Sequence, residues 1–539
     1  MLPMTRSGLA RIAVVVVTAC MISTLSPAPS AAQEHMTGFR QAVAEYASDD
    51  RQLAKFYRDS KFGAVWTGEG AEFLQRRKAL IEALGRASSH GLPQSRYDTS
   101  GLMDQMRRAK TPRDLGVLDV ALSKAYLNYA HDVQSGIVVP SSIDKGIVRK
   151  VNYHDRAELM SDLINGEPAE VMRALAPKAP EYTRLRKEMM RLQTLMTQGG
   201  WGATVPERKL EPGDIGAAVI KLRDRLIAMG YLGRSATMSY DKSIESAVQQ
   251  FQSDHGLAAD GVAGTSTLTE INVPVEDRLK SVLVAMERER WMNMERGKRH
   301  VLVNLTDFTA KIVDDGKVTF ETRSVVGMNQ HDRRSPEFSD VMEHMIINPT
   351  WNVPRSIAVK EYLPQLQKNP NAASHLRLTD IRGRLVDREA VDFTQFNTRN
   401  FPFDMKQPPS SRNALGLVKF MFPNPQNVYL HDTPAKSLFG RESRAYSHGC
   451  IRLQKPFEFA YALLARQTED PKGQFQSILK TGRETKVELE QHIPVHIIYR
   501  TATIPAKGKA HYRRDVYGRD AHIWDALEQA GVALGAVRG

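Results

Sequence analysis

The sequence contains very little cysteine. Only Cys20 and Cys450 occur among its 539 residues. Two thiols cannot build a disulfide framework, and without a Cys-x-x-Cys pair the chain has neither a cysteine-rich zinc site nor a dithiol redox centre. Any sulfur chemistry must therefore depend on one thiol.

Long apolar runs and compositional bias are also missing. With 42% hydrophobic residues, 36 glycines and 27 prolines, the chain is neither globally disordered nor of low complexity. The apolar run at residues 12–25 is shorter than the roughly 20 residues that a membrane-spanning helix needs. At about 100 to 200 residues per domain, the length predicts three or four folded units.

The N-terminal segment predicts export. Arg6 and Arg11 precede the apolar run, and small residues follow it up to Ala32. This order is typical of a secretory signal cleaved after Ala32. A membrane anchor is an alternative, but the run is short for one, and a lipoprotein with a lipidated Cys20 is disfavoured because apolar residues continue beyond that cysteine. We therefore predict a signal peptide at residues 1–32, a location in the periplasm or cell envelope, and no transmembrane segment after cleavage.

The charge balance is basic. The formal net charge is +13 and the excess is spread along the chain. Such a protein suits an anionic cell envelope and would equally suit nucleic acid. Export and the lack of an arginine-rich recognition helix argue against nucleic acid, which is therefore not an expected partner.

Periodicity and glycine-rich breaks predict a multidomain chain. Residues 33–198 show helical spacing of apolar residues and predict a mainly helical scaffold domain. Residues 203–273 predict a small domain of amphipathic helices joined by glycine turns. Residues 295–500 contain short, β-branched runs that predict a β-rich domain, interrupted at 357–415 by polar helical and irregular stretches that suit an inserted lid subdomain. The C-terminal extension, residues 501–539, is basic and partly helical, without an interpretable motif.

The residues around Cys450 predict nucleophilic chemistry. A thiol that attacks a carbonyl needs a base within reach and donors for the oxyanion. His431 ends a predicted strand whose one face carries Asn427, Tyr429 and His431, so it can lie beside the loop that holds Cys450. His448 is too near in sequence to aim well at the sulfur. Gly449 lets consecutive backbone amides approach a substrate oxygen.

The residues around Cys450 also allow two other interpretations. A free cysteine is commonly a small buried apolar residue, but that role needs no flanking His-Gly pair and no histidine on an upstream strand. Zinc could use His431, His448 and Cys450, but no fourth ligand has suitable spacing. We therefore expect neither a metal nor another cofactor.

Fifteen residues, 432–446, lie between His431 and Ser447. This spacing, together with the segment Ser447-His448-Gly449-Cys450-Ile451-Arg452, resembles the signature of the L,D-transpeptidases, the YkuD-type cysteine enzymes of bacterial cell walls. Asn348-Pro349-Thr350-Trp351 and the domain order resemble the large YcbB-like branch of that family. Residues 214–264 are similar to the small peptidoglycan-binding domain of cell-wall enzymes.

The resemblance implies a mechanism. Cys450 would attack a tetrapeptide stem and form a thioester, with His431 as the base and then the acid. A second stem would then accept the acyl group in a 3→3 cross-link, and carbapenems would inhibit the enzyme. Peptidoglycan stem peptides are therefore the expected partners.

The resemblance also implies supporting roles. Ser447, His448 and Gly449 would brace the loop and hold the oxyanion. Arg452 would pair with a substrate carboxylate or with the protein itself. Tyr429 would line the acyl-donor pocket or belong to the strand core.

Other functions stay open at this point. The acyl acceptor could be a protein amine, which would attach envelope proteins to the wall, or water. The β-rich domain could also be a relic in a non-catalytic scaffold that binds the wall, although the intact Cys450 and His431 argue against this reading.

Overall fold

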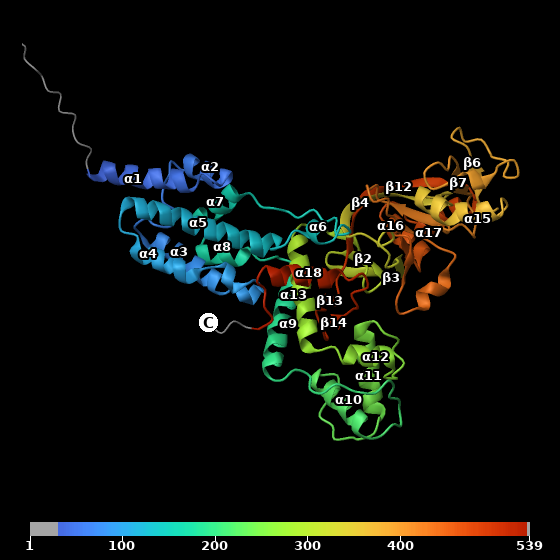
Figure 1. The fold of residues 1–539 in the computed structure, drawn as a ribbon, viewed down its shortest axis with the longest axis horizontal. Helices are drawn as coiled ribbons and strands as arrows, with labels where there is room; N and C mark the ends of the chain where they lie inside the picture. The colour runs from blue at the N-terminus through green and yellow to red at the C-terminus, as the bar shows by residue number, and fades with distance from the viewer. Residues whose placement is uncertain (1–30, 536–539) are drawn as a thin grey trace, which may run out of the picture.

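The computed structural model describes residues 31–535 (Figure 1). The predicted signal peptide up to residue 30, including Cys20, lies outside the described residues. Helix α1 (Ala31–Tyr46) is the first described element. No helix within 31–535 is both long enough and apolar enough to cross a membrane.

The N-terminal region is helical and has its own hydrophobic core. Its longest helix, α5 (Pro112–Ser135), begins at a capping box formed by Thr111 and Asp114. The buried carboxylate of Asp119 on this helix accepts hydrogen bonds from the backbone amides of Val65, Trp66 and Thr67. The other helices are α2 (Arg51–Asp59), α3 (Ala71–Gly85), η1 (Ala87–His90), η2 (Gln94–Arg96), α4 (Thr99–Arg108), α6 (Pro140–Ile143), α7 (Arg156–Asn165) and α8 (Pro168–Ala174).

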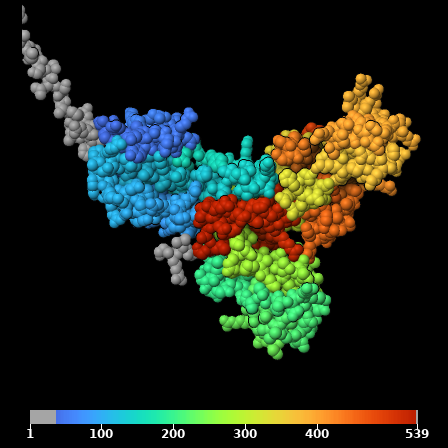
Figure 2. All heavy atoms as spheres, in the orientation of Figure 1, coloured from blue at the N-terminus to red at the C-terminus, as the bar shows by residue number. Residues whose placement is uncertain are grey.

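A separate core joins the middle of the chain to its C-terminal end. Helix α9 (Pro180–Thr197) packs along α13 (Val275–Trp291), and the C-terminal extension completes this core with β13 (Ala502–Thr503), β14 (His511–Tyr512) and α18 (Arg519–Gln529). In Figure 2 the red C-terminal segment lies between the blue helical region, the green segment and the orange β-rich domain. We call this core the hub.

Buried ion pairs hold the hub to the β-rich domain. Arg288 on α13 pairs with Glu337 and, at 3.0 Å, with Asp520 on α18. Arg519 pairs with the same Glu337 at 3.1 Å. All four side chains are buried. The extension is therefore an integral part of the fold, because it supplies the second buried partner of Arg288 and the second buried partner of Glu337.

The small helical unit folds around a core of its own. It consists of α10 (Ala217–Ala228), α11 (Lys242–His255) and α12 (Thr265–Ile271). Asp241 caps the start of α11, and Gly256 ends that helix in the left-handed conformation.

The β-rich domain is a sheet that closes on itself. The pairing order is β10-β3-β11-β9-β8-β4-β12-β1-β2, and β2 also pairs with β3, which closes the ring. Alternate side chains fill one shared core, to which α16 (Pro456–Leu464) and α17 (Pro471–Lys480) contribute. The strands are β1 (Arg299–Asn304), β2 (Thr309–Asp314), β3 (Lys317–Gly327), β4 (Phe338–Ile347), β8 (Val418–Met421), β9 (Leu430–His431), β10 (Ala445–Ser447), β11 (Ile451–Leu453) and β12 (Thr485–Ile498).

An insertion between β4 and β8 has its own small core. The sequence predicted helical and irregular stretches here, and the structure adds a small sheet in the order β5-β7-β6. Its elements are β5 (Trp351–Asn352), α14 (Arg355–Ile357), the π-helix η3 (Ala358–Tyr362), α15 (Leu363–Lys368), β6 (Arg377–Thr379), η4 (Phe393–Gln395) and β7 (Asp404–Gln407).

Candidate functional site

One outer face of the closed sheet gathers the candidate residues. Strands β9 and β11 run parallel, with Arg452 beside His431 and Ile451 beside Leu430. Because side chains alternate, Ile451 and Leu430 enter the core while Arg452 and His431 project from the opposite face. Cys450 directly precedes β11, and Tyr429 directly precedes β9. Each lies two positions before Arg452 or His431, and so on the same face, where the two residues contact each other.

The strand that carries His431 is shorter than the sequence predicted. It begins only at Leu430, and Asn427 has a positive φ of 52°, so Asn427 is not an extended residue on the His431 face. A hydrogen bond from the Val428 amide to the Asn424 side chain belongs to the turn that replaces the predicted strand start. The carbonyl of Asn427 instead lies 3.7 Å from Cys450 Sγ and accepts a hydrogen bond from it.

The Cys450 thiol is partly exposed but its surroundings disfavour the thiolate. Burial raises the pKa of Cys450, whereas hydrogen bonds from Tyr429 and the positive charges of Arg452 and Lys419 act to lower it. Burial dominates, so the resting sulfur holds its proton at neutral pH.

His431 is buried and neutral. Its Nδ1–H donates to the carbonyl oxygen of Asp432 at 2.5 Å, which leaves Nε2 with a lone pair. Burial lowers the pKa of His431 to about 3, and Arg452 acts in the same direction. In residues 31–535 no hydrogen bond joins the ring to Cys450 Sγ, although the Tyr429 ring contacts His431 edge-on with centroids 5.6 Å apart. The resting pair is thus a thiol and a neutral imidazole.

The loop before Cys450 is braced from inside. Buried Ser447 donates to the Cys450 carbonyl at 2.5 Å and accepts from the Gly449 amide at 3.2 Å. Gly449 has a φ of 119°, which favours glycine. Since the Gly449 amide is already used, the loop amides that donate no hydrogen bond within the described chain are those of His448 and Cys450.

Two cations flank the thiol, and Glu484 is the one carboxylate in the described chain that acts on either of them, on Lys419 and without a close ion pair. Lys419 lies opposite His431 in the β8–β9 pairing, and Arg452 lies opposite it in the β9–β11 pairing. Burial lowers the pKa of both side chains, and neither forms an ion pair with any residue that the structure describes. The Nε of Arg452 is buried and unsatisfied. Such a site is suited to bind an anion.

Sequence reasoning missed Lys419. It belongs to no motif and lies 31 positions before Cys450. The only signal was a lysine between Val418 and Phe420, which are buried strand residues.

His448 points to the insertion. Its Nε2 lies 2.6 Å from Glu361 Oε1 on η3, and Arg333 reaches the same oxygen at 2.6 Å. The expected loop brace is thus a contact between the Cys450 loop and the insertion. Glu361 was also missed, because nothing local in the sequence relates it to position 448.

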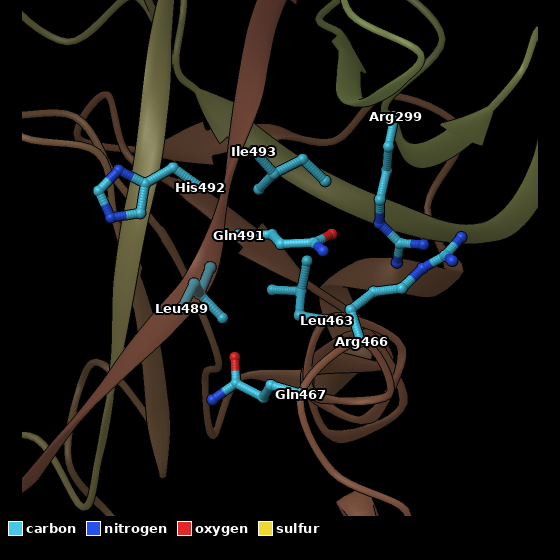
Figure 3. A pocket seen from close by; sticks show the side chains of 8 residues that line it. All are labelled: Arg299, Leu463, Arg466, Gln467, Leu489, Gln491, His492 and Ile493. Carbon is cyan, nitrogen blue, oxygen red and sulfur yellow. The ribbon is translucent and has the colours of Figure 1, made fainter.

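A separate, small pocket of about 60 Å³ lies between β12 and the end of α16 (Figure 3). Arg299 and Arg466 point toward one another at its side, and both pair with Asp314. None of its lining residues belongs to the Cys450 face. Across residues 31–535 no group of three or more His, Cys, Asp or Glu side chains is arranged to hold a metal ion.

Comparison with known families assigns three parts of the chain. A scaffold domain matches residues 51–189, and a peptidoglycan binding domain matches residues 215–271. The L,D-transpeptidase catalytic domain of the YkuD family matches residues 298–487, which include the whole Cys450 face. The chain contains a YkuD-type L,D-transpeptidase domain. The expected multidomain class, with a helical N-terminal region, a peptidoglycan-binding unit and a β-rich domain of this family, is thereby confirmed.

Relatives with this domain are known. A Haemophilus influenzae protein described as an L,D-transpeptidase is 30% identical over 256 residues, which are 46% of this chain and 51% of that protein. The chain thus spans about half the length of this relative. The zinc D-Ala-D-Ala carboxypeptidase of Streptomyces albus G is 40% identical over 75 residues, 13% of this chain and 27% of that protein.

Solved L,D-transpeptidase structures give a weaker likeness. The structure from Xylanimonas cellulosilytica is 13% identical, with a TM-score of 0.18, over 54% of this chain and 98% of that one. The structure from Stackebrandtia nassauensis is 17% identical, with a TM-score of 0.22, over 55% and 97%.

Proposed function

We propose that this protein is a cell-wall L,D-transpeptidase that forms 3→3 peptidoglycan cross-links through a thioester on Cys450. The family match supports a transpeptidase that acts on peptidoglycan in the cell envelope. The observation that carries the proposal is the single face with a thiol, a neutral histidine, unused loop amides and unpaired cations.

Acylation begins with a proton transfer. The Cys450 thiol gives its proton to His431 Nε2, and the sulfur attacks the carbonyl carbon between the diamino acid and the terminal D-Ala of a tetrapeptide stem. The Cys450 amide donates to the oxyanion. When the C–N bond breaks, His431 returns the proton to the departing amine of D-Ala, and the thioester remains.

The resting electrostatics determine when the proton moves. Because burial raises the pKa of Cys450 and lowers the pKa of His431, a thiolate–imidazolium pair is unfavourable before substrate binds. Proton transfer therefore accompanies the attack. The thiol must also leave the Asn427 carbonyl and turn toward the ring.

Substrate charge would be matched by the unpaired cations. Arg452 and Lys419 can pair with a carboxylate of the stem peptide, and such a pair would offset the cost of burying each cation alone. Tyr429, on the same face, would form a wall of the acyl-donor pocket.

Deacylation completes the exchange. The amine of a second stem attacks the thioester, His431 accepts its proton, and the Cys450 thiol is restored. A protein amine or water could replace this acceptor. The insertion would decide among them, because Glu361 places it against the Cys450 loop.

Intact-mass spectrometry tests the proposal. Wild type and Cys450→Ala are incubated with meropenem and, separately, with a disaccharide-tetrapeptide. We expect a stable drug adduct on the wild type alone, together with a dimeric muropeptide that lacks one D-Ala. A folded wild type with neither adduct nor product would contradict the proposal and favour the non-catalytic scaffold. A product without a dimer would indicate water as the acceptor.

A further inference from the structure

A buried serine contacts the Cys450 loop from behind. Ser335, between β3 and β4, is fully buried, and its hydroxyl donates to the carbonyl of Gly449 at 2.6 Å. The same hydroxyl accepts from the Gly327 amide at 2.9 Å. A Cβ at Gly327 would lie 2.0 Å from the Arg333 carbonyl, so the β3–β4 loop is held closely against β3.

This contact orients the amide of Cys450. The Gly449 carbonyl and the Cys450 N–H belong to one planar trans peptide, in which the two bonds point in opposite directions. With the carbonyl directed at buried Ser335, the N–H is directed away from it. In the described part of the chain that N–H donates to no other group. It is an oriented and unused donor.

The C-terminal extension holds Ser335 in place. Tyr517, just before α18, donates its hydroxyl to the Gly327 carbonyl at 2.5 Å and accepts from the Ser335 amide at 3.3 Å. Arg519 donates to the Ser335 carbonyl at 3.0 Å and pairs with Glu337. Both side chains are almost completely buried. The extension therefore fixes the backbone on both sides of Ser335.

We propose that Ser335, held by Tyr517 and Arg519 of the C-terminal extension, is a positioning residue that aims the Cys450 amide at the oxyanion. This inference rests on the proposed function. It gives the extension a role in catalysis through contacts that cross more than 100 residues of sequence.

The test compares two reactions of one thiol. Acylation by meropenem develops an oxyanion at a carbonyl, whereas alkylation by iodoacetamide displaces iodide and develops none. A lost oxyanion donor therefore slows only the first reaction. Both rates are followed by intact-mass spectrometry on the full chain at one pH.

We expect Ser335→Ala to slow acylation about 10- to 100-fold while alkylation stays within about twofold of wild type. Ser335→Thr retains a hydroxyl and should restore most of the acylation rate. Tyr517→Phe keeps the ring packed against Tyr499 and should slow acylation by about threefold or more.

Matched controls come from the same regions. Ser324 on β3 is buried but its hydroxyl has no hydrogen-bond partner in the described structure, so Ser324→Ala should leave both rates unchanged. Tyr512 is a buried phenol of the extension that donates to Glu188, and Tyr512→Phe should not change acylation selectively.

Three results would overturn the inference. Ser335→Ala could be acylated by meropenem at the wild-type rate. Its acylation and alkylation rates could fall together. The control variants could also be acylated more slowly while their alkylation rates stay unchanged. If Ser335→Ala fails to fold, Tyr517→Phe decides in the same way. A wild type that is alkylated but never acylated would contradict the proposed function as well, whereas an acylated wild type with an equally reactive Ser335→Ala contradicts this inference alone.

Discussion

At the scale of single residues, the reactivity of Cys450 depends on opposing influences. Burial raises the pKa of the thiol, while Tyr429, Arg452 and Lys419 lower it. The cations are close in space because they occupy one row across three paired strands. In the proposed function a substrate carboxylate would neutralise that row, so the same residues would bind the substrate and tune the thiol.

Lys419→Met should make the thiol less acidic. Loss of the positive charge raises the pKa of Cys450, so the pH profile of iodoacetamide alkylation should move to higher pH and the rate at pH 7 should fall roughly 2- to 10-fold. Lys486→Met on β12, where the lysine pairs with Glu488, is the matched control. Coincident profiles for wild type and Lys419→Met would contradict this electrostatic account.

At the scale of elements, the insertion is linked to the catalytic domain by neighbouring residues of η3. Lys360 pairs with Asp332 at 2.5 Å, and Glu361 pairs with Arg333 and His448. The first pair is about half exposed, and exposed pairs contribute only about 0–1 kcal/mol. Glu361 is more buried and has two partners, the cation Arg333 and the imidazole of His448 on the Cys450 loop. It is therefore the stronger link.

Glu361→Gln should loosen the insertion. We expect hydrogen exchange in residues 355–368 to become several-fold faster, because a neutral amide cannot balance the charge of Arg333 and loses the carboxylate contact with His448. Lys360→Gln, one residue away, should change exchange by less than about twofold. Equal effects of the two substitutions would show that burial of Glu361 is unimportant.

At the scale of the whole molecule, the hub packs against both the helical N-terminal region and the β-rich domain. Within the hub, α9 and α13 pack against η1 and α5 of the helical region, and Arg519 on α18 pairs with Glu337 beside β4. The extension supplies Ile523, Trp524 and Leu527 to the core of the hub. Arg288 and Glu337 pair with each other, and each takes its second buried partner from the extension.

Truncation after Arg500 should destabilise the protein severely. It exposes the apolar surface of α9 and α13, and it removes one of the two partners of buried Arg288 and one of the two partners of buried Glu337. We expect mostly aggregated protein, or a midpoint of thermal unfolding more than about 10 °C lower. Truncation after Gly535 removes no described residue and is the control. A stable, soluble product ending at Arg500 would show that the hub is dispensable.

Acid should also destabilise the fold. Burial lowers the pKa of His90 and His431 to about 3 and that of His496 to about 4, below the ordinary value near 6.5 in the unfolded chain. Below pH 6.5 the unfolded state binds protons that the folded state does not, so stability is present above that pH and is lost as the pH falls. Asp520, whose pKa burial raises to about 6, acts in the opposite direction.

Between pH 7 and pH 5 each histidine should cost about 1–2 kcal/mol, and Asp520 should recover about one such contribution. Thermal unfolding at these two pH values measures the net effect, which we expect to be a clearly lower midpoint at pH 5. A midpoint that stays constant or rises would mean that these histidines are protonated in the folded protein.

Much of the architecture was predictable because its signals are local. The helical spacing of residues 33–198, the small unit of amphipathic helices at 203–273 and the short β-branched runs after residue 295 all depend on neighbouring residues. The small sheet of the insertion was not predicted, because its strands are short and pair across polar, irregular segments. The left-handed Asn427 was missed for a related reason, since a turn interrupted an alternating pattern.

The candidate site divides in the same way. The sequence by itself determined the family of the domain and predicted the cysteine chemistry, because the residues from Ser447 to Arg452 and His431 at its fixed spacing form a recognisable motif. Only the tertiary structure decided what surrounds that motif. Lys419, Glu361 and Ser335 reach it through strand pairing and loop packing. The C-terminal extension reaches it across the whole domain. Their effects depend on burial and on the direction of a peptide group, which arise only when distant segments are packed together.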